Sequence, residues 1–301
     1  MNPSRILVVG NVNVDLILGP QTPWPTPGTE VALPHRDLRP GGQAGNVALA
    51  LEALNAPFVL LGNRGDDLLG DWLQEEFAHA TAHWQRYAAP TSISVGITHP
   101  DRERTYFTHL GHLESVGAES VLPVLQAARA GEVLLLLGGF LTPKLRAAYP
   151  QLLALAEGQG LSVALDPGWP PQGWETCREE MLAWLPHCQH LLINEIEALQ
   201  LAQTDRLDPA ASILQRHLPA GATLVIKRGA AGAEAWRGEE IAVASAPSVE
   251  VIDTIGAGDI FNAAYLTTQL EGQPLQKSLE AGVEVASQAI STFPRRYRRT
   301  L

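Results

Sequence analysis

The 301-residue sequence predicts an α/β fold in which helices flank a doubly wound, mostly parallel sheet that carries a small lid of β-strands. Three observations predict this class. Short apolar runs recur along the chain, segments with helix signals separate most of them, and each run continues into glycine or a polar residue. Runs this short, without polar alternation, suit strands that are buried on both faces between two helix layers.

Six apolar runs are the expected strands of the main sheet. In chain order they are Ile6–Val9, Phe58–Leu61, Val133–Leu137, Val163–Leu165, Leu191–Ile193 and Leu224–Ile226. Between them, Val47, Leu51 and Leu54 repeat at helical spacing. The dipeptides Thr142-Pro143 and Asp208-Pro209 each look like an N-cap followed by proline at the first helical position.

The residues that follow these runs predict where a ligand binds. At the strand ends stand Gly10-Asn11, Gly62-Asn63, Gly138-Gly139, Asp166-Pro167, Asn194-Glu195 and Lys227-Arg228-Gly229. In open α/β sheets ligands collect outside the carboxyl ends of the strands, where helix N-termini and accessible backbone are available. We therefore expect the functional site at that edge of the sheet.

Two stretches lack a helix between their strands. One runs from about Leu16 to Leu38, and the other pairs Ser92–Thr98 with Arg104–His109 around a turn at Pro100-Asp101-Arg102, which is a hairpin pattern. We interpret the chain as one domain over residues 1–301, with a β lid formed by insertions at about 12–40 and 91–110. The alternative interpretation of these two stretches is that they are a pair of surface loops rather than a lid.

Composition disfavours several classes of protein. With 21 basic and 32 acidic side chains, the formal charge of −11 argues against nucleic acid or an anionic membrane as a partner, because binding polyanions needs a basic footprint. The basic run Arg295–Arg299 is interpreted as a solvated tail. No apolar run approaches the roughly 20 residues that cross a bilayer, and Met1–Arg5 do not resemble a signal peptide. The two cysteines are expected to be reduced in a cytoplasmic protein.

The segment Asp253-Thr254-Ile255-Gly256-Ala257-Gly258-Asp259 carries the strongest chemical signal. Small residues at Gly256, Ala257 and Gly258, at the start of an expected helix, let backbone amides converge into an anion hole of the kind that phosphoryl transfer needs. Asp259, in the first turn, can accept a proton from an attacking hydroxyl. The alternative is a tight glycine turn in which Asp259 complements the helix dipole.

Two further segments suit a polyol. Gly41 and Gly42 allow a ligand to approach the backbone, and Asn46 can both donate and accept hydrogen bonds. The alternative there is a pair of loop glycines with Asn46 as a helix cap. After the first strand, alternation puts three partners for vicinal hydroxyls on one side, namely Asn11, Asn13 and Asp15. A half-exposed strand with a polar face is the competing reading. The sequence has no Rossmann fingerprint and no Walker A loop.

These residues carry a resemblance to a known family. The segment from Asp253 to Asp259 resembles the C-terminal signature of the ribokinase-like, or PfkB, carbohydrate kinases. Gly41-Gly42 to Asn46, followed by Gly65-Asp66-Asp67 and Gly70, resembles their N-terminal signature, and Asn13 with Asp15 matches their substrate strand. The match covers nearly the whole chain in the family's order. It implies an α/β domain with a β lid that transfers the γ-phosphate of ATP to a hydroxyl group.

The resemblance also implies roles for individual residues. Asp259 is the base, the amides of Gly256, Ala257 and Gly258 form the anion hole, and the substrate is held by Asn13, Asp15, Gly41, Gly42 and Asn46. Asn194 lies near the phosphates, while Glu197 acts on Mg²⁺ largely through water. The same pair also reads as a capping box, and the two readings are compatible.

The resemblance also implies roles for residues on the nucleotide side of the site. Lys227 contributes charge, and Gly229 and Gly232 admit phosphates and ribose. Asp253 matches a position that orders the anion-hole loop and, in many relatives, helps form a monovalent-cation site; here we favour the loop role. Relatives usually continue past the last helix, whereas this chain ends at Leu301, so the resemblance does not say how the adenine pocket and a cation site are completed.

Several alternatives for the function stay open. The first hypothesis is a kinase that uses ATP and Mg²⁺ on a free sugar, and the second is a nucleoside kinase, because ribosides offer the same hydroxyls. A non-catalytic sugar- or nucleotide-binding relative is the third, and a nicotinamide dehydrogenase is the weakest. Trp169 is a candidate for stacking on a ligand, although packing is its default role. The expected partner is a small molecule, with a homodimer through the lid as a further candidate.

Overall fold

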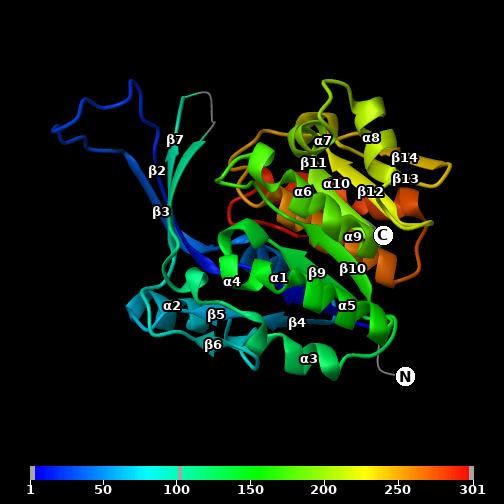
Figure 1. The fold of residues 1–301 in the computed structure, drawn as a ribbon. Helices are drawn as coiled ribbons and strands as arrows, with labels where there is room; N and C mark the ends of the chain where they lie inside the picture. Colours follow the sequence, from blue (N-terminus) through cyan, green and yellow to red (C-terminus); the bar gives the residue numbers. More distant parts are fainter. Residues whose placement is uncertain (1–3, 101–103, 298–301) are drawn as a thin grey trace.

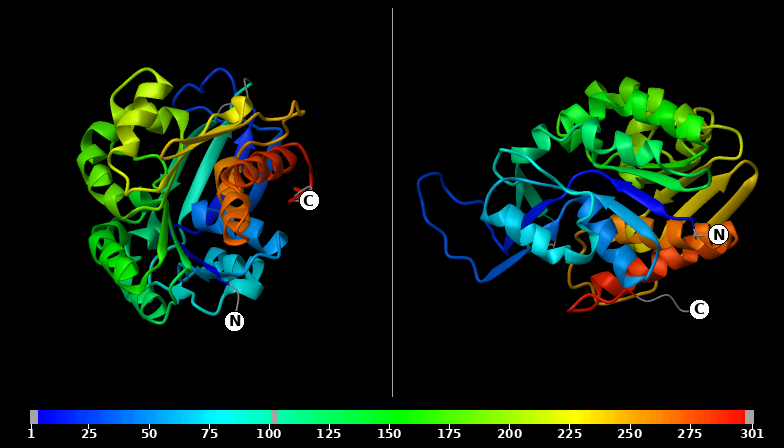
Figure 2. Two further views of the ribbon diagram at one scale, coloured as in Figure 1. Left: turned by 90° about the vertical axis from the view of Figure 1, so that its right-hand side faces the viewer. Right: turned by 90° about the horizontal axis from the view of Figure 1, so that it is seen from below.

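The computed structural model describes residues 4–100 and 104–297. Figure 1 and Figure 2 show a central sheet with helices packed on both of its faces. Most of the expected turn at Pro100-Asp101-Arg102, and the end of the basic run Arg295–Arg299, lie outside the described residues.

The central sheet has eight strands in the order β14-β13-β12-β11-β10-β9-β1-β4. Six are parallel to one another: β1 (Ile6–Val9), β4 (Phe58–Leu61), β9 (Val133–Leu137), β10 (Ser162–Asp166), β11 (His190–Asn194) and β12 (Thr223–Lys227). They contain the six predicted runs, so the fold class is confirmed. An antiparallel hairpin of β13 (Ala233–Arg237) and β14 (Glu240–Ala244) adds an edge that the sequence pattern does not predict.

The parallel strands are apolar throughout because each face meets a helix layer. On β9, Leu134 and Leu136 pack into one core, while Leu135 and Leu137 pack into the other. One layer contains α3 (Leu122–Gln126), α4 (Pro143–Ala147), α5 (Tyr149–Gln159), α6 (Trp174–Trp184), α7 (Glu195–Ala202) and α8 (Leu207–Gln215). The other contains α1 (Gln43–Ala53), α2 (Leu68–Glu76), α9 (Ala257–Leu270) and α10 (Leu275–Ile290).

Short elements complete the connections. A two-stranded sheet joins β5 (Asn63–Arg64) to β6 (Gln85–Arg86). The 3₁₀ turns are η1 (Ala78–Ala80), η2 (Gly111–Glu114), η3 (Ala118–Ser120), η4 (Gly139–Leu141), η5 (Leu185–His187) and η6 (Gly229–Ala231). Cys177 and Cys188 are buried and form no disulfide. Within the described chain, no helix has both the length and the apolar character that crossing a membrane requires.

Two predicted helix starts have different outcomes. Thr142 is the N-cap of α4 and Pro143 is the first helical residue, as predicted, although the Thr142 hydroxyl donates backwards to the Gly139 carbonyl at 3.3 Å. The predicted cap at Asp208 is wrong, because α8 begins at Leu207. Asp208 therefore lies inside the first turn, where its charge complements the helix dipole.

A second sheet of four strands projects from the main body (Figure 1). In the order β3-β2-β7-β8 its strands are β3 (His35–Gly41), β2 (Asn13–Gly19), β7 (Ile93–Thr98) and β8 (Arg104–His109). We call it the lid sheet; its action as a lid stays a prediction. The register pairs Asp15 with Arg39 and with Ser94, so these side chains share one face. Gly96 and Tyr106 form a pair on the same face.

Three of the connections between the two sheets meet at one buried junction, formed by Asn63 and His112. Asn63 donates to the Gly10 carbonyl at 2.9 Å and accepts from the Val12 amide at 3.4 Å. The Ser92 amide donates to His112 Nδ1 at 2.9 Å, so His112 Nε2 carries the proton and donates to Asn63 Oδ1 at 3.0 Å. Burial lowers the pKa of His112 to about 4, which keeps this ring neutral.

Candidate active site

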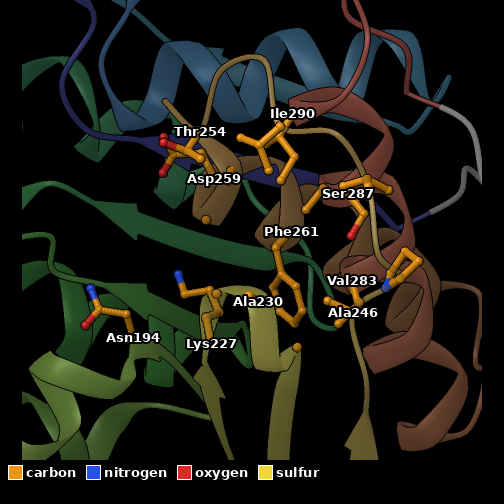
Figure 3. A pocket seen from close by; sticks show the side chains of 18 of the residues that line it. Asn194, Lys227, Ala230, Ala246, Thr254, Asp259, Phe261, Val283, Ser287 and Ile290 are labelled. Atoms are coloured by element: carbon orange, nitrogen blue, oxygen red, sulfur yellow. The ribbon is translucent and has the colours of Figure 1, made fainter. Parts of the chain in front are cut away.

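A cavity of about 710 Å³ opens at the carboxyl ends of β10, β11 and β12. Figure 3 shows Asn194, Lys227 and Asp259 around its polar part and Phe261, Val283 and Ala246 around its apolar part. The polar part unites residues from strand ends and from the start of α9. This is the edge of the sheet at which the sequence predicts a ligand site.

The start of α9 depends on one glycine. Gly256 is the N-cap residue and has a φ of 71°, in the left-handed region that a side chain disfavours. A Cβ at this position would lie 2.9 Å from the Asn46 carboxamide. Gly256 therefore both turns the chain into the helix and leaves room for Asn46.

The first residues of α9, Ala257 and Gly258, line the cavity, and their amides have no partners inside the helix, as at any helix N-terminus. The first intrahelical bond is donated by Ile260 to the Gly256 carbonyl at 2.9 Å. The Ala257 amide donates to the Thr254 carbonyl at 3.2 Å, so this predicted member of an anion hole already has a turn partner. Gly258 lies close to Lys227, because a Cβ at Gly258 would be 3.3 Å from Lys227 Nζ.

Asp259, the predicted base, is buried in the first turn of α9 with an exposed fraction of 6%. Its Oδ2 accepts from Asn46 Nδ2 at 2.9 Å and its Oδ1 from Gln43 Nε2 at 3.4 Å. Burial raises the pKa of Asp259 to about 7, with a further contribution from the negative charge of Asp166. The group therefore changes its protonation state near neutral pH.

Asn46 is not the cap of α1, because Gly42 occupies that position and has a φ of 81°. The alternative that Asn46 is a helix cap is therefore wrong. Its amide instead holds the carboxylate of Asp259 from a segment more than 200 residues earlier in the chain. This contact joins the two glycine-rich segments that the sequence singled out.

Asp166 lies at the centre of the polar part, and the sequence analysis did not identify it as a site residue. Its Oδ2 accepts from Lys227 Nζ at 2.6 Å and from Asn262 Nδ2 at 2.7 Å, and its Oδ1 accepts from Gln43 Nε2 at 3.0 Å. Burial alone would raise its pKa, but the Lys227 ammonium and these hydrogen bonds hold the pKa of Asp166 below its usual range. The available signal was its place at the end of a strand, among the polar strand ends at which the sequence predicts the site.

Asn194 and Glu197 form the capping box that the sequence offers as one reading. Asn194 Oδ1 accepts from the Glu197 amide at 2.9 Å, and Glu197 Oε2 accepts from the Asn194 amide at 2.8 Å. Both residues also line the cavity. Burial raises the pKa of Glu197 to about 7, and the charge of Asp166 adds to this effect.

The buried Glu197 carboxyl fits a divalent cation that is held largely through water and phosphate. Mg²⁺ usually keeps several waters and takes only one or two carboxylates from the protein. Among the described residues, no group of three or more His, Cys, Asp or Glu side chains forms a dedicated metal cage. A carboxyl whose charge is costly to bury would be stabilised in its ionised form by such a cation.

The remaining predicted nucleotide positions surround the end of β12. Lys227 Nζ also lies 3.2 Å from Asn262 Oδ1. Gly229 and Gly232 line the cavity. At Gly232, with a φ of 93°, a Cβ would lie 1.9 Å from the Ala244 carbonyl oxygen, so the neighbouring strand requires a glycine here.

The predicted substrate residues form a hydrogen-bonded row on the other side of Asp259. Asn13 Nδ2 donates to Asp15 Oδ1 at 2.8 Å, and Asn11 Nδ2 donates to Asn13 Oδ1 at 3.2 Å. The Gln43 amide donates to Asn11 Oδ1 at 3.3 Å, so Gln43 links this row to Asp259. Burial raises the pKa of Asp15 to about 6, against the opposing charge of Arg39.

Gly41 and Gly42 are required by close contacts within the protein itself. A Cβ at Gly41 would lie 2.3 Å from the Asp15 carboxylate, and one at Gly42 would lie 2.4 Å from the Asn11 carbonyl oxygen. The sequence interpretation, in which these glycines admit a ligand to the backbone, is thus supplemented by a packing requirement. Trp169 is 56% exposed beyond the end of β10 and meets Trp174 edge-on.

The apolar part of the cavity is formed by two segments near the end of the chain. It is lined by the segment 246–251 after β14 and by one face of α10, including Val249, Val251, Val283, Ala286 and Ile290. The α10 residues recur at positions i, i+3 and i+7, which is the helical spacing by which this wall could be found in the sequence.

Asp253 is surrounded by arginine side chains. Its Oδ1 accepts from Arg104 Nη2 at 2.9 Å, and its Oδ2 accepts from Arg295 Nη2 at 2.7 Å and also from Arg39. These contacts hold the pKa of Asp253 below its usual range, although burial alone would raise it. Arg295 is therefore not part of a solvated tail, and that prediction is wrong for this residue; the next residue, Arg296, is exposed.

Comparison with known proteins relates this geometry to a family. The family model described as pfkB family carbohydrate kinase matches residues 3–294. An ATP-dependent ribose-1-phosphate kinase from Halopiger xanaduensis is 26% identical over 280 residues, which cover 92% of this chain and 88% of that protein.

Two solved structures share the fold. The structure of adenosine kinase from Sinorhizobium meliloti superposes with a TM-score of 0.85 at 24% identity and covers 98% of this chain and 96% of its own. A structure from E. coli, described as a ribokinase II in complex with ATP and Mg²⁺, superposes with a TM-score of 0.79 at 16% identity and covers 96% of this chain and 93% of its own.

Proposed function

The chain belongs to the pfkB family of carbohydrate kinases, and from this premise we propose that it transfers the γ-phosphate of ATP to a hydroxyl group of a free sugar. Its activity is thus that of a sugar or nucleoside kinase, and the choice of a sugar is the finer part of the proposal. One observation carries it: Asp259 stands at the start of α9, between the row of substrate residues and the cavity of about 710 Å³.

Asp259 is the proposed base. Its carboxylate, held by Asn46, accepts the proton of the acceptor hydroxyl as that oxygen attacks phosphorus. A pKa of about 7 suits this role, because the group is substantially ionised at physiological pH and still binds a proton readily. The amides of Gly256, Ala257 and Gly258 stabilise the charge on the transferred group, with the Ala257 amide leaving its turn partner to do so.

The cavity suits a purine nucleotide by its division into two parts. Asn194, Lys227 and the loop with Gly229 and Gly232 would hold the phosphates, while the apolar wall formed by 246–251 and α10 would hold the base. When bound, Mg²⁺ neutralises phosphate charge and helps to hold the phosphates in line. Glu197 would hold it, largely through water.

The acceptor side suits a polyol. Asp15 and Asn13 offer the carboxylate and carboxamide that pair with vicinal hydroxyls, and Ser94 Oγ and Thr108 Oγ1 are hydrogen-bonded to each other at 2.9 Å on the adjoining strands. Closure of the lid sheet over this face would exclude water from the transfer. A nucleoside is the second candidate acceptor, since Tyr106 on the lid sheet and Trp169 both have exposed aromatic rings.

A panel of sugars and nucleosides in a coupled assay for ADP release tests the acceptor. We expect turnover with at least one sugar, and at least a roughly hundredfold lower kcat with that sugar for the Asp259→Asn variant. Turnover with nucleosides alone would overturn the sugar assignment and support the second candidate. The variant Asp208→Asn is the matched control, because Asp208 is an exposed acid in the first turn of α8.

We also propose that two copies associate through the outer face of the lid sheet. Trp24 and Phe107 are both more than half exposed, and their ring centroids lie 6.0 Å apart. An apolar cluster of this kind on a projecting sheet gains stability when it is covered. Light scattering at several concentrations tests the proposal, and a mass that stays monomeric throughout would overturn it.

A further inference from the structure

Asp253 stands immediately before the anion-hole loop, and its carboxylate has no free acceptor position. Oδ1 accepts from Arg104 Nη2 and from the Ile255 amide, each at 2.9 Å, and Oδ2 accepts from Arg39 and Arg295. A carboxylate offers about four lone-pair sites, and these four donors fill them. The three arginines come from β3, from β8 and from the segment after α10.

Arg295 has the most informative position of the three. Its Nη2 donates both to Asp253 Oδ2 and to the backbone carbonyl of Ile255, at 2.7 Å each. A carboxylate oxygen and a carbonyl oxygen gathered around one positive group form the kind of donor set that binds hard metal cations. Here the positive group is a guanidinium from the chain itself.

A monovalent metal cation does not fit beside Asp253. Three guanidinium groups already contact the carboxylate of Asp253, so a cation added beside it would be repelled by three positive charges. The carboxylate of Asp37 lies 3.5 Å from Arg39, and so offsets part of only one of these charges. The side chain of Asp253 is only 22% exposed, so water screens an added ion poorly. An incoming ion would have to displace Arg295 to reach both oxygens.

We propose that Arg295 is a positioning residue that takes the place of a monovalent cation in this enzyme. By bridging Asp253 to the Ile255 carbonyl, it fixes the residue that precedes Gly256 and so the start of α9. Phosphoryl transfer consequently does not depend on K⁺ or Na⁺. This inference rests on the proposed function only for its kinetic readout.

The kinetic test compares chloride salts of K⁺, Na⁺ and tetramethylammonium at equal ionic strength. We expect equal kcat for the wild-type enzyme in all three. The Arg295→Ala variant should lose roughly tenfold or more in kcat, because the anion-hole loop loses its anchor, with little change in KM for the acceptor. K⁺ or a low concentration of guanidinium should restore part of that loss. Arg296→Ala, a change in the adjacent exposed arginine, is the matched control and should behave like the wild type.

A melting experiment tests the inference without any turnover. We expect K⁺ or dilute guanidinium to raise the Tm of Arg295→Ala, whereas guanidinium lowers the Tm of the wild type as a general denaturant. If Arg295→Ala does not fold, Arg295→Lys keeps the positive charge and serves in both tests, with partial loss of kcat. Activation of the wild type by K⁺ over tetramethylammonium, or full activity of Arg295→Ala in tetramethylammonium, would overturn the inference. Absence of turnover with every acceptor would instead contradict the proposed function and leave the melting test decisive.

Discussion

Lys227 Nζ lies 2.6 Å from Asp166 Oδ2, and this buried ion pair faces the carboxyl group of Asp259 from the ends of β10 and β12. The two charges act in opposite directions, because Asp166 raises the pKa of Asp259 while Lys227 lowers it. They have the same opposed effects on Glu197. The ion pair therefore sets the proton affinity of two groups that the proposed reaction uses.

Replacement of the base should lower kcat strongly and spare nucleotide binding. We expect Asp259→Asn to lower kcat by roughly a hundredfold to ten-thousandfold, since the acceptor hydroxyl loses its proton acceptor. Calorimetric titration with MgATP should give a Kd close to that of the wild type. Normal turnover by this variant would show that Asp259 is not the base, and Asp208→Asn controls for loss of one negative charge.

The rate should depend on pH through the ionisation of Asp259. Because the carboxylate form accepts the proton, kcat/KM should rise with pH through about 7. Asp166→Asn removes the neighbouring negative charge, so the midpoint of this rise should move to lower pH, while the plateau falls because Lys227 and Gln43 lose their anchor. A purely structural role for Asp166 predicts a lower plateau with an unchanged midpoint, and a pH profile of the variant separates the two.

The buried carboxyl group of Asp259 should also reduce the stability of the unliganded protein at alkaline pH. Its folded pKa is raised above the unfolded value, so the folded state binds the proton more tightly and loses stability as pH rises from about 4 to about 7. We expect Asp259→Asn to raise Tm at pH 8 by on the order of a few degrees, and by much less at pH 5. Equal Tm shifts at both pH values would contradict this origin of the effect.

Gly256 should be needed for catalysis as well as for stability. Gly256→Ala forces a side chain into a φ of 71° and against Asn46, which should cost roughly 1–2 kcal/mol of stability and displace the partner of Asp259. Gly272→Ala is a matched control, because Gly272 has a φ of 74° with no atom near its Cβ position. Both variants should melt earlier, and only Gly256→Ala should lose kcat in excess of any folding defect.

The apolar wall of the cavity should govern the affinity for nucleotide. Ala286→Leu places extra volume where the base is proposed to bind, so KM for ATP should rise roughly tenfold or more while KM for the acceptor changes little. Ala281→Leu adds the same volume to the same helix at a position outside the cavity lining. An equal rise in KM for ATP in both variants would contradict the assignment.

The fold was predictable from the sequence where burial leaves a strong signal. β1 and β9 lie between two helix layers, so every residue in them is apolar. The β13–β14 hairpin lies at the edge of the sheet, and its alanines alternate with polar or exposed residues along most of its length, so it lacks the continuous apolar run that marks the parallel strands. The register of the lid sheet also needed coordinates, since no sequence pattern pairs Asp15 with Arg39.

The site was predictable only in its local parts. Gly256 and Asp259 fall within one short segment whose chemistry is evident from its composition. Asp166 gains its importance from Gln43, Lys227 and Asn262, which come from three other elements and meet only in the folded chain. The arginines around Asp253 were missed for the same reason. They are far from Asp253 in the sequence and contact it only in the folded chain.

The junction of Asn63 and His112 makes movement of the lid sheet visible to hydrogen exchange. The amides of Val12 and Ser92 are protected by these two side chains, in segments that lead into β2 and β7. A lid that swings as a rigid body about this point leaves both amides slow to exchange. A lid that detaches from the main sheet releases them together, so their common exchange rate measures detachment separately from swinging.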